Sequence, residues 1–268
     1  MHNDAVPTLF TAWQAPASRR YYPVGRLSFF AEPDGGLYEF AYIRGAEEAE
    51  KEGFLPFLAF PELGRVYCSQ TLFPFFSNRL MPESRPEYME TVISLDLDPD
   101  TAHPIQILGR SGGARVTDEV ELFPLPEFDA DVGGYRTFFL AHGLRHTPVP
   151  SQDRILTLRP GEQLFWFLDC QNPFDPQAIG LRTDDRHLIG YLPNYLLGDA
   201  WRLLEACRYI DVYVARVGGA LTPLSGRLLC DIRSCWPEAV DFVPLSSPRF
   251  EPISAEAHRA TDVGMART

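Results

Sequence analysis

The sequence predicts a mainly β protein of the α+β class, built as two small β-barrel-like domains with a few helices. Short segments that alternate apolar and polar residues recur along the chain, separated by turns rich in Gly, Pro, Asn and Asp. Segments with helical spacing are few. Apolar residues make up 45% and aromatic residues 13% of the 268 residues, which is enough for one or two ordinary hydrophobic cores.

The first half opens with residues 1–19, which are polar and interrupted by proline, so we expect a flexible arm there. A hairpin turn is predicted at Pro33-Asp34-Gly35-Gly36, and the acidic residues 47–52 are expected to form a solvated turn of helix or a loop. The other elements expected in this half are strands over residues 24–30, 37–43 and 115–123, and helices over residues 87–93 and 104–110.

Residues 124–131 are rich in proline and acid, and we interpret them as a domain boundary. Beyond them we expect strands over residues 135–144, 154–158, 163–168, 179–182, 188–192, 210–217 and 226–232, and one amphipathic helix over residues 194–207. The predicted organisation is an arm (1–19), a first domain (20–128), a second domain (133–240) and a weakly ordered tail (241–268).

The net charge of −12 is concentrated in the first half. Residues 1–132 contain ten basic and 21 acidic residues, whereas residues 133–240 contain eleven of each. The second half therefore lacks the broad basic surface that nucleic-acid-binding proteins usually carry. Any nucleic-acid contact there is expected to depend on a small, specific pocket.

The cysteines and the N-terminus predict a cytoplasmic protein without a membrane segment. The first residues lack the basic and then apolar pattern of a secretory signal, and no apolar run is long enough to cross a bilayer. An odd number of cysteines without a CxxC motif indicates reduced thiols rather than a disulfide framework. The five cysteines are Cys68, Cys170, Cys207, Cys230 and Cys235.

Residues 172–179 read Asn-Pro-Phe-Asp-Pro-Gln-Ala-Ile, and residues 189–193 read Ile-Gly-Tyr-Leu-Pro. Together with Gly161-Glu162 and with Gly-Leu-Arg-His at 143–146, this order resembles the signature of the HIRAN domain over about residues 133–235. The resemblance implies an OB-like β-barrel. The best-understood HIRAN domains, attached to helicase-like remodellers, hold the 3′ end of single-stranded DNA. It therefore implies a DNA-binding site made of Arg145, His146, Phe174 and Asp175.

The chemistry of these residues agrees with such a ligand. An Asn-Pro turn leaves Phe174 at a loop tip, where its ring can stack on a base. Asp175 can accept a hydrogen bond from a free sugar hydroxyl, and Arg145 can hold a phosphate as a bidentate donor. In the helicase-linked family members the positions of His146 and Phe174 are both tyrosine, so this chain keeps the charged pair and changes both aromatic residues.

A purely structural interpretation of the same residues stays open. The Asn-Pro pair can be an ordinary tight turn, with Phe174 capping the core and Asp175 latching the backbone. His146 can be a surface or core residue without a ligand.

The first half resembles the N-terminal subdomain of HipA-type toxin kinases over about residues 20–126. The resemblance depends on segments 24–27, 72–83 and 106–114, which occur in the family's order. It implies a toxin–antitoxin context. The kinase core that follows this subdomain in HipA is absent, and the chain has neither a GxxxxGK[ST] motif nor an HRD and DFG pair. Gly112-Gly113 lacks a following lysine, which favours a helix C-cap over a phosphate loop.

We therefore expect a protein without catalytic residues, cofactor or metal. Asp96, Asp98 and Asp100 alternate in a way that suggests a cation site, but a loop at a helix entry fits them better. The leading hypothesis is a DNA-associated module that binds a single-stranded DNA end through its second half. The alternative is an antitoxin-like regulator whose acidic first half docks a kinase or nuclease; a helicase is a further candidate partner.

Overall fold

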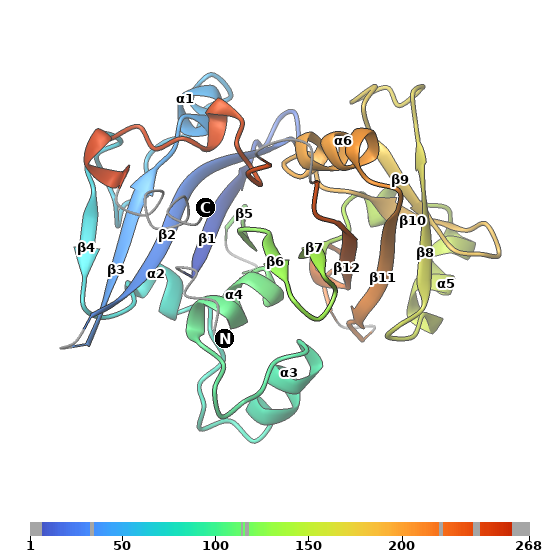
Figure 1. Ribbon diagram of the computed structural model, residues 1–268, viewed down its shortest axis with the longest axis horizontal. Coiled ribbons are helices and arrows are strands. Elements are labelled where there is room, and N and C mark those ends of the chain that lie inside the picture. Colours follow the sequence, from blue (N-terminus) through green and yellow to red (C-terminus); the bar gives the residue numbers. More distant parts are fainter. Residues whose placement is uncertain are drawn as a thin grey trace.

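The computed structural model describes residues 7–32, 35–113, 115, 118–219, 222–237 and 242–258. These residues form two antiparallel sheets accompanied by short helices (Figure 1). The prediction of a mainly β, α+β fold is confirmed. Neither sheet closes into a barrel in the described part of the chain, so the predicted barrels, including the OB-like one, are not found in closed form. An isolated antiparallel bridge between His142 and Tyr191 does join two segments of the second half beyond the strand pairs of its sheet.

The first sheet has the strand order β4-β3-β2-β1-β5. Its strands are β1 (Thr8–Gln14), β2 (Tyr21–Glu32), β3 (Gly35–Tyr42), β4 (Tyr67–Ser69) and β5 (Val120–Pro124). The predicted hairpin is confirmed as the pair β2–β3, with residues 33 and 34 of its turn outside the described residues.

The flexible arm is a wrong prediction for residues 8–14. These residues form β1, which pairs with both β2 and β5 and fully buries Leu9 and Ala12. The strand is hard to recognise because it lies between Pro7 and Pro16. Residues 1–6 lie outside the described part of the chain.

Four helices lie between β3 and β5 in the chain: α1 (Gly45–Glu50), α2 (Pro74–Ser77), α3 (Tyr88–Ser94) and α4 (Pro104–Ser111). Both helices predicted in this half are confirmed, as α3 and α4. At the start of α4, His103 and Gln106 form a reciprocal capping box. The helix ends at Gly112, whose φ of 73° is left-handed, so the glycine pair is the C-cap that its sequence indicated.

The second sheet has the strand order β10-β9-β8-β11-β12-β7-β6. Its strands are β6 (Glu127–Asp129), β7 (Gly134–Leu140), β8 (Gln163–Leu168), β9 (Ile179–Arg182), β10 (Leu188–Tyr191), β11 (Ile210–Val217) and β12 (Leu228–Cys235). The accompanying helices are α5 (Val149–Thr157), α6 (Leu197–Ala206) and the 3-10 turns η1 (Leu144–His146) and η2 (Leu224–Gly226). The predicted amphipathic helix is confirmed as α6.

The strand predicted over residues 154–158 is wrong, because this segment belongs to α5. Pro148 and Pro150 flank the start of the helix, where a missing N–H group is tolerated. Ser151 and Ile155, one helical turn apart, are its buried residues. The helix packs against β10.

The prediction of a weakly ordered tail is wrong for residues 242–258. They contain the 3-10 turns η3 (Pro248–Phe250) and η4 (Ala255–His258). Phe242 packs against Tyr135 of the second sheet, whereas the residues from Phe250 onward contact the first sheet. The backbone N–H of Ile253 donates to the carbonyl of Tyr42 (3.0 Å), and Arg26 donates to the carbonyl of Ala257 (2.7 Å). Residues 238–241 and 259–268 lie outside the described residues.

The predicted boundary coincides with the change of sheet, since β5 ends at Pro124 and β6 begins at Glu127. A hydrophobic core nevertheless continues across it. The ring of Phe123, from the first sheet, stacks on Tyr195 of the second half at 3.8 Å between centroids. Two independently stable domains therefore stay a prediction, and the shared core weighs against their independence.

Cys207 and Cys235 form a disulfide with their Cα atoms 5.7 Å apart. The expectation of reduced thiols is wrong for this pair, because folding brings the end of α6 beside the end of β12, which cysteine spacing does not reveal. Outside this disulfide, Cys68 and Cys170 are exposed and Cys230 is buried. Across the described residues, the helices are too short or too polar to span a bilayer.

Candidate functional site

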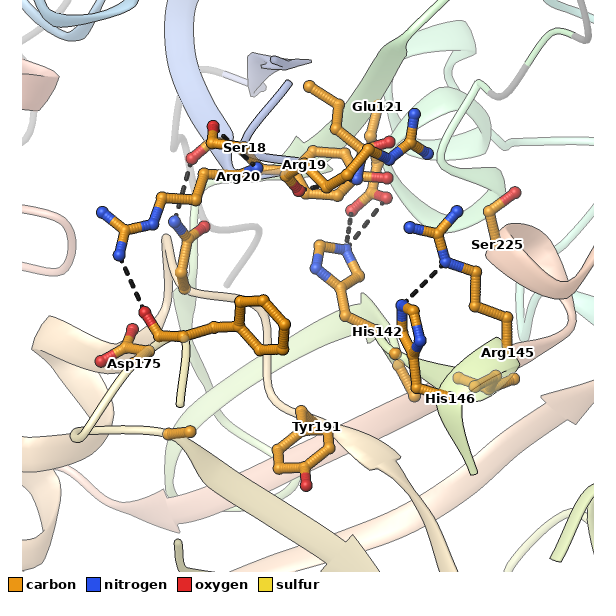
Figure 2. Close-up of a pocket in the computed structure, with 18 of the residues that line it drawn as sticks. Ser18, Arg19, Arg20, Glu121, His142, Arg145, His146, Asp175, Tyr191 and Ser225 are labelled. Atoms are coloured by element: carbon orange, nitrogen blue, oxygen red, sulfur yellow. Dashed lines mark hydrogen bonds and ion pairs between the residues drawn. The ribbon is translucent and has the colours of Figure 1, made fainter. Parts of the chain in front are cut away.

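A cavity of about 650 Å³ opens where the two sheets meet. Its lining comes from the turn before β2, from β5, from the segment after β7 and from the loop between β8 and β9 (Figure 2). The four residues singled out in the sequence, Arg145, His146, Phe174 and Asp175, all line this cavity. The structure therefore brings both predicted segments to one site.

The loop that carries Phe174 is fixed by local hydrogen bonds. The side-chain oxygen of Asn172 accepts from the backbone N–H groups of Phe174 (3.0 Å) and Asp175 (3.2 Å). One carboxylate oxygen of Asp175 accepts from the N–H of Gln177 (2.9 Å). The interpretation that the Asp175 side chain bonds to the nearby backbone is thus correct, but only Oδ1 makes this bond. The other carboxylate oxygen, Oδ2, has no hydrogen-bond partner among the described residues.

Phe174 is not a core residue. Its side chain is 73% exposed at the tip of the loop. An aromatic ring held in this way by a hydrogen-bonded loop is available for stacking on a planar ligand.

Arg145 and His146 lie in η1, directly after Gly143, whose φ of 74° is left-handed. A Cβ at Gly143 would lie 3.1 Å from the ring of Tyr191, so both the backbone angle and the available space favour glycine. The Nε of Arg145 donates to Nε2 of His146 (2.9 Å), an arrangement that requires Nε2 to be unprotonated. Both side chains are exposed.

Arg19, Arg20 and Tyr21 complete the site from the first half, and sequence reasoning missed them because they border the predicted arm. Arg20 donates to the carbonyl oxygen of Phe174 (2.8 Å), and Asn194 donates to the carbonyl oxygen of Tyr21 (3.0 Å). Figure 2 shows Arg20 and Asp175 on one side of the cavity and Arg145 on the other.

A buried polar cluster joins the two halves at the cavity. Glu121 of β5 is 5% exposed, and both its oxygens lie 3.1 Å from Nε2 of His142. The hydroxyl of Tyr195 donates to the same carboxylate. Burial raises the pKa of Tyr195 well above its usual value, and the charge of Glu121 adds to this effect. The pKa of Tyr21 is raised for the same two reasons, so both phenols stay protonated at physiological pH.

A second polar cluster, centred on Asp169, supports the loop that carries Phe174. The hydroxyl of Tyr191 and the side-chain amide of Asn172 each donate to Oδ2 of Asp169, both at 3.1 Å. Burial, followed by the hydrogen bond to Asp169, raises the pKa of Tyr191. Tyr191 lies at the edge of the cavity.

Charges of both signs line the cavity. The ionisable arginines, histidines and acids of its described lining are Arg19, Arg20, Arg115, Arg145, His142, His146, Asp118, Glu119, Glu121, Asp169 and Asp175. Glu119 pairs with Arg19 at 3.4 Å, and Asp118 pairs with a buried arginine outside the lining. Arg20, Arg115 and Arg145, in contrast, form no ion pair with a carboxylate of the described part of the chain. These three arginines are the cations of the lining that are available to an anionic ligand.

The described residues contain no group of three or more His, Cys, Asp or Glu side chains arranged to hold a metal ion. Asp96 pairs with Arg110 and Arg136, and Asp98 accepts from the backbone N–H of Asp100. These contacts favour the loop interpretation of the alternating aspartates over a cation site.

No protein-family model and no curated protein matches the chain. Two solved structures that do match are a protein from Lactobacillus plantarum and the HIRAN domain of human HLTF. The first is 18% identical over 36% of this chain and 91% of its own, with a TM-score of 0.29. The second is 17% identical over 38% of this chain and 75% of its own, with a TM-score of 0.28. Similarities this low assign neither a family nor a function, so the site is interpreted from its own residues.

Proposed function

We propose that the cavity binds single-stranded DNA at a free 3′ end. The observation that carries this proposal is the meeting of three groups in one cavity: an exposed aromatic ring (Phe174), a carboxylate oxygen (Oδ2 of Asp175) and a guanidinium (Arg145). Among the described residues that oxygen has no hydrogen-bond partner, and the guanidinium has no carboxylate partner. A terminal nucleotide presents the matching set of a base, a hydroxyl and a phosphate.

Each group has one role in this proposal. Stacking of the terminal base on Phe174 contributes about 1–3 kcal/mol. Oδ2 of Asp175 accepts a hydrogen bond from the 3′-hydroxyl, because an ionised carboxylate is an acceptor only. Arg145 holds the adjacent phosphate as a bidentate donor. No catalytic step belongs to this proposal.

The mixed charge of the lining supports an end rather than a duplex as the ligand. A long polyanion needs an extended basic surface, and the carboxylates around this cavity oppose one. The sequence resemblance of residues 133–235 to HIRAN domains supports the same ligand class.

Fluorescence anisotropy with a labelled ten-nucleotide oligothymidine tests the proposal. Phe174→Ala should weaken binding by about tenfold through lost stacking. Phe128→Ala is the matched control, since Phe128 is also exposed (48%) and lies outside the cavity lining. Equal losses in the two variants, or no binding by the wild type up to high micromolar protein, would contradict the proposal.

A further inference from the structure

The turn before β2 holds Arg20 in a fixed position. The N–H of Ala15 donates to the carbonyl of Arg20, and the side chain of Gln14 donates to the carbonyl of Arg19. Arg19 has a φ of 58°, a left-handed conformation that is uncommon for residues other than glycine. Such conformations persist where surrounding contacts enforce them, and they are concentrated at functional sites.

Arg20 differs from Arg19 in that its charge is not paired with a carboxylate of the described residues. Arg19 pairs with Glu119, whereas Arg20 has no carboxylate partner among the described residues and is exposed. The Arg20 side chain donates through Nη2 to the carbonyl of Phe174. A guanidinium has five N–H donors in a planar fork, so this contact leaves donors for a ligand beside the stacking ring.

We infer that Arg20 binds a backbone phosphate of the DNA strand, so that the site is shared between the two halves of the chain. The inference rests on the proposed function and extends it, because Arg20 is contributed by the first half and lies across the cavity from Arg145 (Figure 2). An unpaired arginine is the side chain best suited to bidentate phosphate binding. Its contact with Phe174 places that charge beside the base-stacking loop.

A purely positioning role predicts a different result. If Arg20 only holds the loop, then any donor to the Phe174 carbonyl should replace it. Arg20→Gln keeps an amide donor and removes the charge, whereas Arg20→Ala removes both. Arg208→Gln is the matched control, since Arg208 is exposed and lies outside the cavity lining.

The experiment measures the affinity of these variants for the same labelled oligothymidine between about 50 and 300 mM NaCl. A contacted phosphate contributes about 0.7 to the slope of log affinity against log salt for a single strand. We expect Arg20→Gln to lower the slope by about this amount and the affinity about tenfold, and Arg208→Gln to change neither. Wild-type slope and affinity in Arg20→Gln would overturn this inference alone. Absence of wild-type binding would overturn the proposed function as well.

Discussion

Nε2 of His142 lies 3.1 Å from both carboxylate oxygens of Glu121, and this contact links the second half of the chain to β5 of the first sheet. Tyr195 donates to the same carboxylate, so the buried Glu121 side chain contacts two residues of the second half. The candidate site lies directly beside this cluster. Its shape therefore depends on the junction between the halves.

Removing the Glu121 side chain should destabilise the folded protein. Glu121→Ala leaves the buried hydroxyl of Tyr195 without an acceptor, and we expect a loss of about 2–3 kcal/mol in the free energy of unfolding. Glu119→Ala is the control, because Glu119 is half-exposed and forms a surface pair that contributes about 0–1 kcal/mol. Urea unfolding followed by circular dichroism measures both, and equal effects would show that the cluster does not hold the junction.

The shared core predicts that the two halves unfold together. Phe123 stacks on Tyr195 across the boundary, and separation of the halves would expose both rings. Urea unfolding should therefore give one transition, with coincident curves from tryptophan fluorescence and far-ultraviolet circular dichroism. Two separate transitions would instead support two independent domains.

Stability should fall with rising pH because of Asp199. Burial raises the pKa of this carboxyl from 3.8 to about 6, against the opposing effect of the Leu245 N–H group. The folded state then holds a proton that the unfolded state releases, so this stabilisation is complete below about pH 4 and is lost as the pH rises through about 6. The loss is on the order of 3 kcal/mol.

Asp199→Asn tests the sign of this effect. The variant keeps an oxygen for the Leu245 N–H group and has no ionisable carboxyl. The difference in unfolding free energy between variant and wild type should shift in favour of the variant between pH 4 and pH 7. A constant difference across this range would show that Asp199 does not ionise in the way described.

The parts of the fold that depend on near neighbours could be predicted from the sequence. The turn at Asn172 uses bonds to residues two and three positions later, and the C-cap at Gly112 needs only its own backbone angle. The exposed position of Phe174 and the hydrogen bond from the backbone to Asp175 could be predicted for the same reason.

Features that depend on contacts between residues far apart in the chain could not be predicted from the sequence. The contact of Arg20 with Phe174 joins positions 154 residues apart, and nothing local signals it. The strand β1 was mistaken for an arm because one of its two neighbours in the sheet, β5, is more than a hundred residues away in the chain. The open sheets depend equally on long-range strand pairing, which periodicity within single segments does not determine.

The most direct measurement compares oligonucleotides that differ only at their ends. Fluorescence anisotropy would measure the affinity of the wild type for matched strands with a 3′-hydroxyl, a 3′-phosphate or a 5′-phosphate. The 3′-hydroxyl strand should bind at least about tenfold more tightly than the 3′-phosphate strand, because the phosphate removes the donor to Asp175 and adds a like charge. A 5′-phosphate should have little effect, and Asp175→Asn should reduce the difference between the 3′ ends. Equal affinity for all three strands, tighter binding of the 3′-phosphate, or no binding at all would contradict end recognition by this cavity.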